Sequence, residues 1–192
     1  MKTPHKRIVA GKYKGKPLRL PPKSTTRSSK GIVLESFFNT VQFEIVDALF
    51  VELFSGSGSV GLEALSRGAK HVWFMERDRE ALRVLRGNIA QTDPAACDVV
   101  AGDTFANIGR VVEELRRRKE KAYFFIDPPF SIRQGHEDIY DRTVETIATL
   151  PAEIVRLITI EHMSGLELPD AIGPFALQKR KKFGKTTLSY YL

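Results

Sequence analysis

Apolar and polar positions along the chain follow two different periods. Short runs rich in branched and aromatic apolar residues alternate with segments whose apolar residues recur every three or four positions. The first pattern is typical of buried strands and the second of amphipathic helices. After a leading helix at 32–41, the pattern predicts strands at 48–54, 71–76, 98–101, 122–126 and 155–161, with helices at 60–67, 79–90, 105–118 and 137–150. Such alternation predicts a doubly wound α/β fold with a mainly parallel sheet.

The two ends of the chain have patterns of their own. Strands are predicted at 175–182 and 186–191, and because the loop between them is too short for a helical crossover, we expect them to pair antiparallel at one edge. Residues 7–20 alternate apolar and basic side chains around Gly11 and Gly15, which predicts a β-hairpin. We therefore predict a small N-terminal extension at residues 1–30 and one α/β domain at residues 31–192.

Composition narrows the class of protein. A chain of 192 residues, 42% hydrophobic and 28% charged, is typical of a globular domain with a real core. No apolar stretch approaches the roughly twenty residues that span a bilayer, and the basic N-terminus lacks the apolar centre of a signal peptide, so we expect a cytoplasmic protein. Cys97 is the only cysteine and the four histidines are scattered, so neither a disulfide nor a metal site is predicted.

Positive charge is concentrated at the N-terminus. Residues 1–30 hold ten Lys and Arg side chains and no acid, and removing them from the net charge of +7 leaves the rest of the chain at −3. Such a basic segment suits contact with RNA phosphates, although a solvated tail is the alternative. A second basic cluster at 179–185 precedes the last strand, and its alternative is a charged turn between edge strands. The RNA-binding candidates are Arg7, Lys12, Lys14, Lys16, Arg19, Arg27, Lys182 and Lys185.

Acidic residues and a glycine loop end three successive predicted strands. Glu52 precedes a loop with Gly56 and Gly58, Glu76 ends the second strand, and Asp103 follows the third. Because the carboxyl ends of parallel strands meet at one edge, we expect them to bind a nucleoside-like cofactor. The glycines would let the backbone approach, Glu76 would accept from ribose hydroxyls, Asp103 from an adenine amino group, and Glu52 would face a cationic end. The candidate set also contains Phe54, Ser57, Arg77 and Thr104.

Other interpretations of these residues remain. Each acid alone could cap a helix or meet its dipole. The run from Gly56 to Gly61, with Glu76 twenty residues after Gly56, also fits a dinucleotide-binding fingerprint and hence an oxidoreductase. An oxidoreductase, however, has no evident use for the basic N-terminus or for the tetrapeptide at 127–130. These features favour S-adenosylmethionine as the cofactor.

The tetrapeptide Asp127-Pro128-Pro129-Phe130 follows another apolar strand. An exocyclic base amine is a poor nucleophile, and the Asp127 carboxylate and Pro128 carbonyl could both accept its hydrogens. Pro129 would stiffen the turn and Phe130 would stack on a base taken out of its helix. An ordinary turn at the end of a strand is the alternative. Together with the glycine loop, the tetrapeptide predicts an enzyme that methylates a base amino group.

These motifs resemble those of the RsmD family of small-subunit ribosomal RNA guanine-N2 methyltransferases. The resemblance extends over nearly the whole chain and is carried by segments 7–15, 35–39, 52–58, 76–78, 127–130 and 183–186. It implies a class I, Rossmann-like fold with a seven-stranded, mainly parallel sheet and an antiparallel last strand. It also implies S-adenosylmethionine as cofactor and guanine 966 of 16S RNA, modified during subunit assembly, as target. The chain departs from the family where Ile32 and Leu34 replace two arginines, which bears on the RNA contacts expected there.

Two rival functions belong to different classes. A DNA adenine-N6 or cytosine-N4 methyltransferase would use the same tetrapeptide, but it usually needs a recognition region that is not evident here. A noncatalytic RNA-binding assembly factor would keep the fold without the reaction. Cys97 begins a strand and lacks the setting of an activated thiol, which argues against a covalent cytosine-C5 mechanism. We expect a monomer, because no pairing helix or apolar patch is evident.

Overall fold

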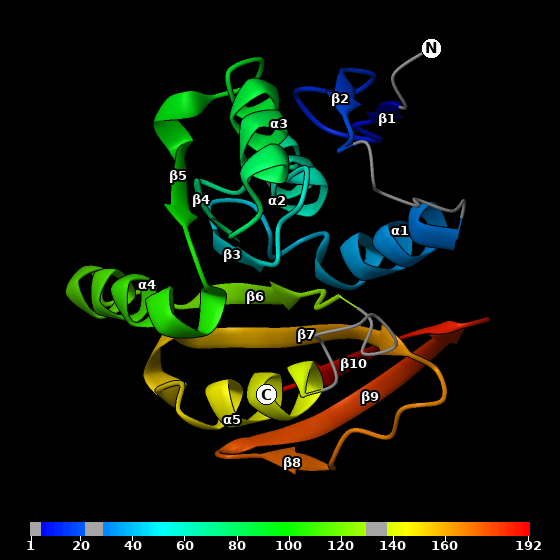
Figure 1. The fold of residues 1–192 in the computed structure, drawn as a ribbon, viewed down its shortest axis with the longest axis vertical. Coiled ribbons are helices and arrows are strands. Elements are labelled where there is room, and N and C mark those ends of the chain that lie inside the picture. The colour runs from blue at the N-terminus through cyan, green and yellow to red at the C-terminus, as the bar shows by residue number, and fades with distance from the viewer. Residues whose placement is uncertain (1–4, 22–28, 130–137) are drawn as a thin grey trace.

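The computed structural model describes residues 5–21, 29–129 and 138–192. Its centre is an eight-stranded sheet (Figure 1). The strands are β3 (Leu49–Leu53), β4 (His71–Glu76), β5 (Cys97–Ala101), β6 (Ala122–Ile126), β7 (Val155–Met163), β8 (Ala171–Ile172), β9 (Phe175–Phe183) and β10 (Thr186–Tyr191). Their order across the sheet is β5-β4-β3-β6-β7-β10-β9-β8. This arrangement confirms the predicted α/β fold.

The sheet is parallel over its first five positions and antiparallel beyond them. β10 inserts between β7 and β9 and runs antiparallel to both, as the antiparallel pairing of the last two strands predicts. The prediction of seven strands misses β8, whose two residues pair with β9 at the edge. Two residues are too few to produce a hydrophobic period, so the sequence gives no signal for this strand.

Helices cover both faces of the sheet. They are α1 (Ser29–Val41), α2 (Ser59–Ser66), α3 (Arg79–Ile89), α4 (Thr104–Arg118) and α5 (Ile139–Ala148), with 3₁₀ turns η1 (Pro94–Ala96) and η2 (Ala152–Ile154). α1, α2 and α3 share one buried cluster with alternate residues of the strands, and α4 and α5 share a second cluster with the others. In Figure 1, α1, α2 and α3 accordingly lie above β6 and β7, and α5 lies below them.

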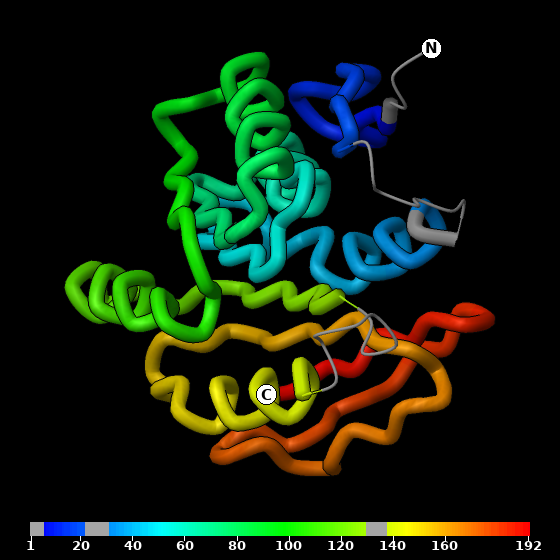
Figure 2. Tube along the Cα trace, in the orientation of Figure 1, coloured from blue at the N-terminus to red at the C-terminus, as the bar shows by residue number. Residues whose placement is uncertain are grey.

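The pairing of β3 with β6 sets the position of the functional loops. β3 and β6 are some seventy residues apart in sequence but pair in parallel, with Leu53 opposite Ile126. Figure 2 shows these two segments side by side in the middle of the molecule. The glycine loop that follows β3 and the Asp127 segment that follows β6 therefore leave the sheet at the same edge, as predicted.

The N-terminal hairpin packs on the α/β domain. β1 (His5–Arg7) pairs antiparallel with β2 (Pro17–Arg19), and Figure 1 shows both beside α2 and α3. Ile8 and Leu18 are buried in the cluster that α2 and α3 also fill, which stabilises the docking by about 1.5–3 kcal/mol for each side chain. The basic segment is therefore a docked element over residues 5–21 and not a detached arm. No helix in the described ranges is long and apolar enough to cross a membrane.

Candidate active site

The loop between β3 and α2 has an unusual backbone. Phe54, Gly56 and Gly58 all have left-handed φ angles, of 58°, 53° and 76°. A Cβ at Gly58 would lie 2.4 Å from Cδ1 of Leu85, so both the φ angle and the space require glycine there. At Gly56 no heavy atom lies within 4 Å of the corresponding position. The loop therefore turns sharply against the core and leaves room for a ligand to approach the backbone of Gly56.

Ser55 holds this strained turn in place. Its amide donates to the carbonyl of Met75 (2.9 Å), and its hydroxyl donates to the carbonyl of Glu52 (2.7 Å). A left-handed φ at a residue such as Phe54 costs of order 1–3 kcal/mol and persists only where neighbouring bonds fix it. The Phe54 ring in turn packs edge-on against Phe105 of α4, with the ring centroids 5.6 Å apart.

Glu76, at the end of β4, is bonded directly to the glycine loop. The amide of Gly56 donates to Oε2 of Glu76 (2.7 Å), and the amides of Arg77 and Asp78 both donate to Oε1 (2.8 Å each). An ionised carboxylate offers about four acceptor positions, so this one can still accept from a ligand hydroxyl. The structure thus brings together Glu76 and the loop, as the sequence predicts, and fixes the carboxylate beside it.

Asp103 lies between β5, which is the neighbour of β4 in the sheet, and the start of α4. Its Oδ1 accepts from the amide of Ala106 (3.0 Å), so the side chain caps the helix. Arg77 and Arg142 also approach its carboxylate, at 3.9 Å and 3.7 Å. Capping occupies one oxygen and leaves the carboxylate partly exposed at the edge that holds Glu76. The side chain of Thr104, another predicted cofactor contact, is buried.

Glu52 has a different environment from Glu76. It is 4% exposed, and its carboxylate accepts from the amides of Gly61 (2.8 Å) and Val60 (3.3 Å) in the first turn of α2. Burial raises the pKa of Glu52 to about 8, against the lowering effect of these two amides, and the charge of Asp127 raises it further. The carboxylate is therefore turned to the helix, and its contact with the cationic end of a ligand stays a prediction.

Asp127 and the two prolines end β6 at the same edge. Asp127 is half-buried, Pro128 is buried and Pro129 is half-buried, while Phe130 lies outside the described residues. The buried hydroxyl of Tyr140 on α5 is close enough for the charge of Asp127 to raise its pKa, although burial is the main cause. The predicted catalytic and cofactor residues thus meet at one edge, with Asp127 between the glycine loop and β7.

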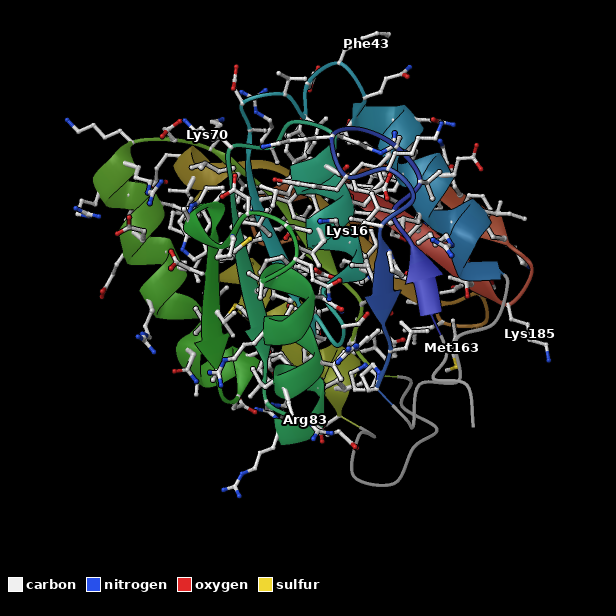
Figure 3. All side chains as sticks on the ribbon, turned by 90° about the horizontal axis from the view of Figure 1, so that it is seen from above. Lys16, Phe43, Lys70, Arg83, Met163 and Lys185 are labelled. Carbon is white, nitrogen blue, oxygen red and sulfur yellow. The ribbon has the colours of Figure 1, made fainter. Side chains whose placement is uncertain are left out.

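The predicted RNA-binding cations of the hairpin lie mostly at the surface. Lys12, Lys14, Arg7 and Arg19 are exposed, and Arg27 lies outside the described residues. The guanidinium of Arg7 donates to the carbonyl of Gly15 (2.7 Å). Lys16, labelled in Figure 3, donates to the carbonyl of Gln91 after α3, so part of its role is to hold the hairpin on the domain.

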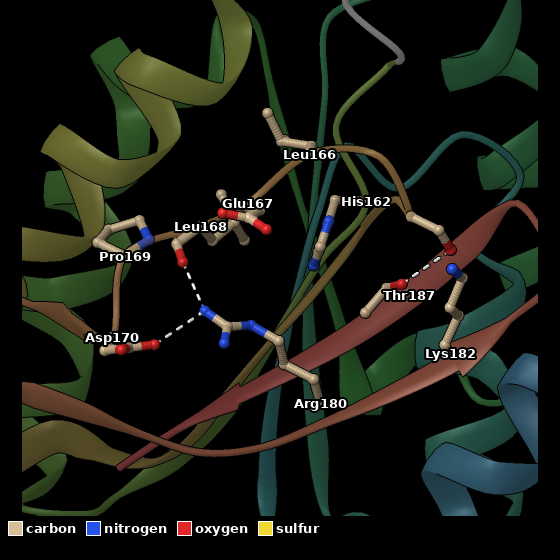
Figure 4. A pocket seen from close by; sticks show the side chains of 10 residues that line it. His162, Leu166, Glu167, Leu168, Pro169, Asp170, Arg180, Lys182 and Thr187 are labelled. Atoms are coloured by element: carbon tan, nitrogen blue, oxygen red, sulfur yellow. Dashed lines mark hydrogen bonds and ion pairs between the residues drawn. The ribbon is translucent and has the colours of Figure 1, made fainter.

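A pocket of about 660 Å³ lies beside the end of β7 (Figure 4). It is lined by His162, Ser164, Leu166, Glu167, Leu168, Pro169, Asp170, Arg180, Lys182 and Thr187. Arg180 donates to the carbonyl of Leu168 (2.6 Å) and to Asp170 (3.0 Å), so its charge is already engaged. Lys182 brings a second cation to the pocket, and Figure 3 shows Lys185 in the next turn pointing away from the fold.

His162 and Cys97 have structural surroundings. The ring nitrogens of His162 lie 2.9 Å from the carbonyl of Met163 and 2.8 Å from the hydroxyl of Ser189, and burial lowers its pKa. The side chain therefore packs inside the fold with both ring nitrogens engaged. Cys97 is half-buried and burial raises its pKa to about 12, so it is not an activated thiol. Trp73 and Phe74 are core residues.

Several residues near the site carry no motif in the sequence. Lys6 of β1 reaches the hydroxyl of Ser59 (3.4 Å) and lowers the pKa of Glu52. Asn88 of α3 contacts both the hairpin and the glycine loop. Glu161 lies buried at the end of β7, next to Asp127. Only the tertiary fold brings them to the edge, although the acid at the end of a strand was a signal for Glu161.

The chain is similar to proteins named as methyltransferases. The family model described as "Conserved hypothetical protein 95" matches residues 6–192. "Ribosomal RNA small subunit methyltransferase D" of Escherichia coli is 29% identical over 96% of this chain and 88% of its own. "Putative rRNA methyltransferase YlbH" of Bacillus subtilis is 26% identical over 96% and 97%. A solved structure titled "Putative methyltransferase yhhF from Escherichia coli" is 28% identical, with a TM-score of 0.77 over 98% of this chain and 97% of that one.

Proposed function

Because the chain belongs to the RsmD family, whose family model matches residues 6–192, we propose that it methylates the N2 amino group of a guanine in 16S ribosomal RNA. The relatives named rRNA methyltransferases support methylation of ribosomal RNA, and the family resemblance adds guanine 966 as the target. The observation that carries the proposal is the meeting of Asp127 and the glycine loop at one edge of the sheet, through the pairing of Leu53 with Ile126.

S-adenosylmethionine is the proposed cofactor, and it supplies a methyl group on a positively charged sulfur. The residues present fit such a ligand. The backbone at Gly56 is open, and Glu76 is fixed beside it by three amides with acceptor positions to spare for ribose hydroxyls. Asp103 would accept from the adenine amino group with the oxygen that does not cap α4. The rings of Phe54 and Phe105, which pack against each other, would provide an apolar wall for the ligand.

Asp127 and the prolines would orient the guanine amine. The Asp127 carboxylate and the Pro128 carbonyl accept its two hydrogens, and this turns the nitrogen lone pair towards the methyl carbon. In a direct displacement the amine nitrogen would bond to the methyl carbon as the carbon–sulfur bond broke, and the bonding pair would stay on sulfur. Asp127 stabilises the positive charge that develops on nitrogen and can take the released proton afterwards. Most of the acceleration would come from positioning.

The basic hairpin and the β9–β10 turn would hold the RNA. Exposed Lys12, Lys14 and Lys185 suit phosphate contacts, which carry affinity without reading sequence. Arg7, Arg19 and Lys182 complete this surface, with Arg27 from the segment that follows the hairpin. Phe130 would stack on the flipped base, which is the role that the tetrapeptide predicts for it.

Methyl transfer to three substrates tests the proposal. The protein is incubated with labelled S-adenosylmethionine and with protein-free small-subunit RNA, unmodified assembled subunits or duplex DNA, and the products are digested and identified by mass spectrometry. We expect N2-methylguanosine from an RNA substrate, and the better RNA substrate identifies the assembly state that is read. Methylated adenine or cytosine in DNA, or no transfer despite cofactor binding, would overturn the proposal.

A further inference from the structure

A second carboxylate lies at the level of Asp127 on the neighbouring strand. Ile126 of β6 pairs in parallel with Ile160 of β7, so Asp127 and Glu161 follow at the same level and on the same face of the sheet. Glu161 is 5% exposed and is flanked on its other side by Leu188 of β10. A buried carboxylate at this position is costly, and such groups cluster where function requires them.

Tyr140 of α5 lies near both carboxylates. The hydroxyl of Tyr140, which is buried on α5, has its pKa raised first by burial and then by the charges of Asp127 and Glu161. A single side chain is therefore within electrostatic reach of both. The backbone of Met163, two residues after Glu161, also reaches this hydroxyl. Asp127, Glu161 and Tyr140 thus lie near the carboxyl ends of β6 and β7, a region that we call the polar corner.

This corner lies on the side of Asp127 that faces away from the cofactor residues. In the order β4-β3-β6-β7, Glu76 and the glycine loop belong to β4 and β3, and Glu161 belongs to β7. With the proposed cofactor on the β3 side of Asp127, the ring that carries the amine would extend towards β7, where Glu161 lies.

The atom beside the amine differs between bases. In guanine the N2 amino group lies between N1–H, a donor, and N3, an acceptor, whereas in adenine and cytosine the one ring nitrogen beside the amine is an acceptor. An ionised carboxylate only accepts hydrogen bonds, whereas a protonated carboxyl can also donate. In its ionised form Glu161 would bond to N1–H of guanine and repel the ring-nitrogen lone pair of the other two bases, so the discrimination requires this side chain to be ionised when the base is bound.

We propose that Glu161 is a specificity-determining residue that accepts the N1–H of the target guanine, while Asp127 accepts from its N2 amine. The inference rests on the proposed function and assigns the choice of guanine to one side chain. A site built to bond a particular N–H rejects an analogue without it far more strongly than an apolar pocket rejects a change of shape.

The test uses 2-aminopurine, which keeps the amine and has a lone pair in place of N1–H. A small-subunit RNA fragment is synthesised with guanine or 2-aminopurine at the nucleotide that the wild-type protein methylates. The ratio of kcat/KM for the two RNAs is then measured. We expect the wild-type protein to prefer guanine by about 100-fold or more. Comparable rates on the two RNAs would overturn the inference even without a variant.

The variant Glu161→Gln sharpens the test. Its amide can donate to the lone pair of 2-aminopurine as well as accept from guanine, so we expect the preference to fall to within about tenfold. Glu113→Gln is the matched control, because Glu113 is an exposed acid on α4, and it should keep the wild-type preference. Both RNAs are compared in one protein preparation, so a partly unfolded variant does not change the ratio.

The outcomes separate the two proposals. If the wild-type protein forms N2-methylguanosine and Glu161→Gln leaves the preference unchanged, the role of Glu161 is wrong and the proposed function stands. If the wild-type protein forms no N2-methylguanosine on any RNA, the proposed function fails and the inference fails with it. A collapse of the preference in Glu161→Gln alone supports both.

Discussion

Glu52 and Glu76 show how the surroundings of a residue decide its role. Glu52 lies on β3 and Glu76 on the neighbouring β4, and both carboxylates accept from backbone amides. Glu52, however, is buried against α2, whereas Glu76 is only partly buried beside the glycine loop. A Cβ at Gly61 would lie 2.9 Å from the Glu52 carboxylate, so a glycine is needed for this close approach. The Glu52 carboxylate is bonded to the first turn of α2, whereas the Glu76 carboxylate is bonded to the glycine loop, where the proposed ligand would lie.

The raised pKa of Glu52 predicts that stability depends on pH. Between its ordinary value of 4.5 and about 8, the folded protein holds a proton that the unfolded chain has released. Glu52 therefore contributes its full share to the free energy of unfolding below pH 4.5, and this stabilisation is lost as the pH rises through about 8. Glu52→Gln stays neutral throughout, so urea unfolding from pH 5 to 9 should show a smaller loss of stability than in the wild-type protein.

Glu145→Gln provides the control for this measurement, because Glu145 is exposed on α5. It should keep the wild-type dependence on pH. Equal slopes for Glu52→Gln and the wild-type protein would show that Glu52 does not retain its proton in the folded state.

Glu76→Ala should weaken cofactor binding. The change removes the proposed acceptor for the ribose hydroxyls and leaves the amide of Gly56 without its carboxylate partner. Loss of hydrogen bonds to a charged group predicts a rise in the Kd for S-adenosylmethionine of roughly 10- to 100-fold, which calorimetry can measure. Glu113→Ala, at an exposed position on α4, should bind normally, and equally tight binding by Glu76→Ala would exclude the assigned contact.

The sequence could place these residues but could not orient them. An acid at the end of a strand next to a glycine loop is visible in the sequence, and the positions of Glu76, Asp103 and Asp127 at one edge were predicted from it. The direction of the Glu52 side chain depends on which face of β3 meets the first turn of α2. That is a property of the packed fold and not of the local spacing.

At the scale of elements, Asn88 connects three parts of the molecule. It lies on α3 and is fully buried, its Oδ1 accepts from the amide of Arg19 (2.9 Å), and its Nδ2 donates to the carbonyls of Arg19 (3.0 Å) and Ser57 (2.9 Å). One amide side chain thus joins the last strand of the hairpin to the glycine loop. Glu63 adds a second junction, because its carboxylate accepts from the amides of Val9 (2.7 Å) and Ala10 (3.0 Å).

Asn88→Ala should loosen both the hairpin and the glycine loop. Three hydrogen bonds are lost, and the backbone groups of Arg19 and the buried carbonyl of Ser57 lose a partner, so we expect a loss of roughly 2–4 kcal/mol in the free energy of unfolding. Hydrogen exchange should also become faster at the amide of Arg19. Gln91→Ala is the control, because that side chain is exposed and donates to the carbonyl of Gly87 in the last turn of the nearby α3. Wild-type stability and exchange in Asn88→Ala would contradict the account.

Elements with strong patterns were predicted well. β4 and β6 have the predicted bounds because each is a short apolar run between clear breaks, and α3 and α4 begin within one residue of the prediction because Asp78 and Asp103 cap them. α1 begins three residues before its predicted start at Ile32. The docking of the hairpin could not be predicted, since Ile8 and Leu18 alternate with cations in the same way in a free hairpin and in a docked one.

For the whole molecule, the distribution of charge predicts how RNA binding responds to salt. The docked hairpin presents Lys12 and Lys14 at the surface, and each phosphate contact that is lost should reduce the slope of log K against log salt by roughly 0.7–0.9. The double variant Lys12→Ala and Lys14→Ala should therefore bind small-subunit RNA more weakly and with a slope smaller by about 1–2. Filter binding over a range of salt concentrations measures both.

A matched double variant, Lys119→Ala and Lys121→Ala, removes two exposed cations after α4. Binding and slope should stay at their wild-type values. An equal effect from the two double variants would mean that net charge, and not the hairpin, determines RNA affinity.

The sheet order gives the whole molecule its proposed chemistry, because it places the cofactor residues of β3 and β4 on one side of Asp127 and Glu161 on the other. The most direct test of this account is the single-turnover rate of methyl transfer to small-subunit RNA by Asp127→Ala, with cofactor affinity measured on the same protein. We expect the rate to fall at least about 100-fold while the Kd for S-adenosylmethionine stays within about threefold, and Asp141→Ala, an exposed acid on α5, to match the wild-type protein. A wild-type rate in Asp127→Ala, or a rate lost only in proportion to cofactor binding, would contradict the central claim.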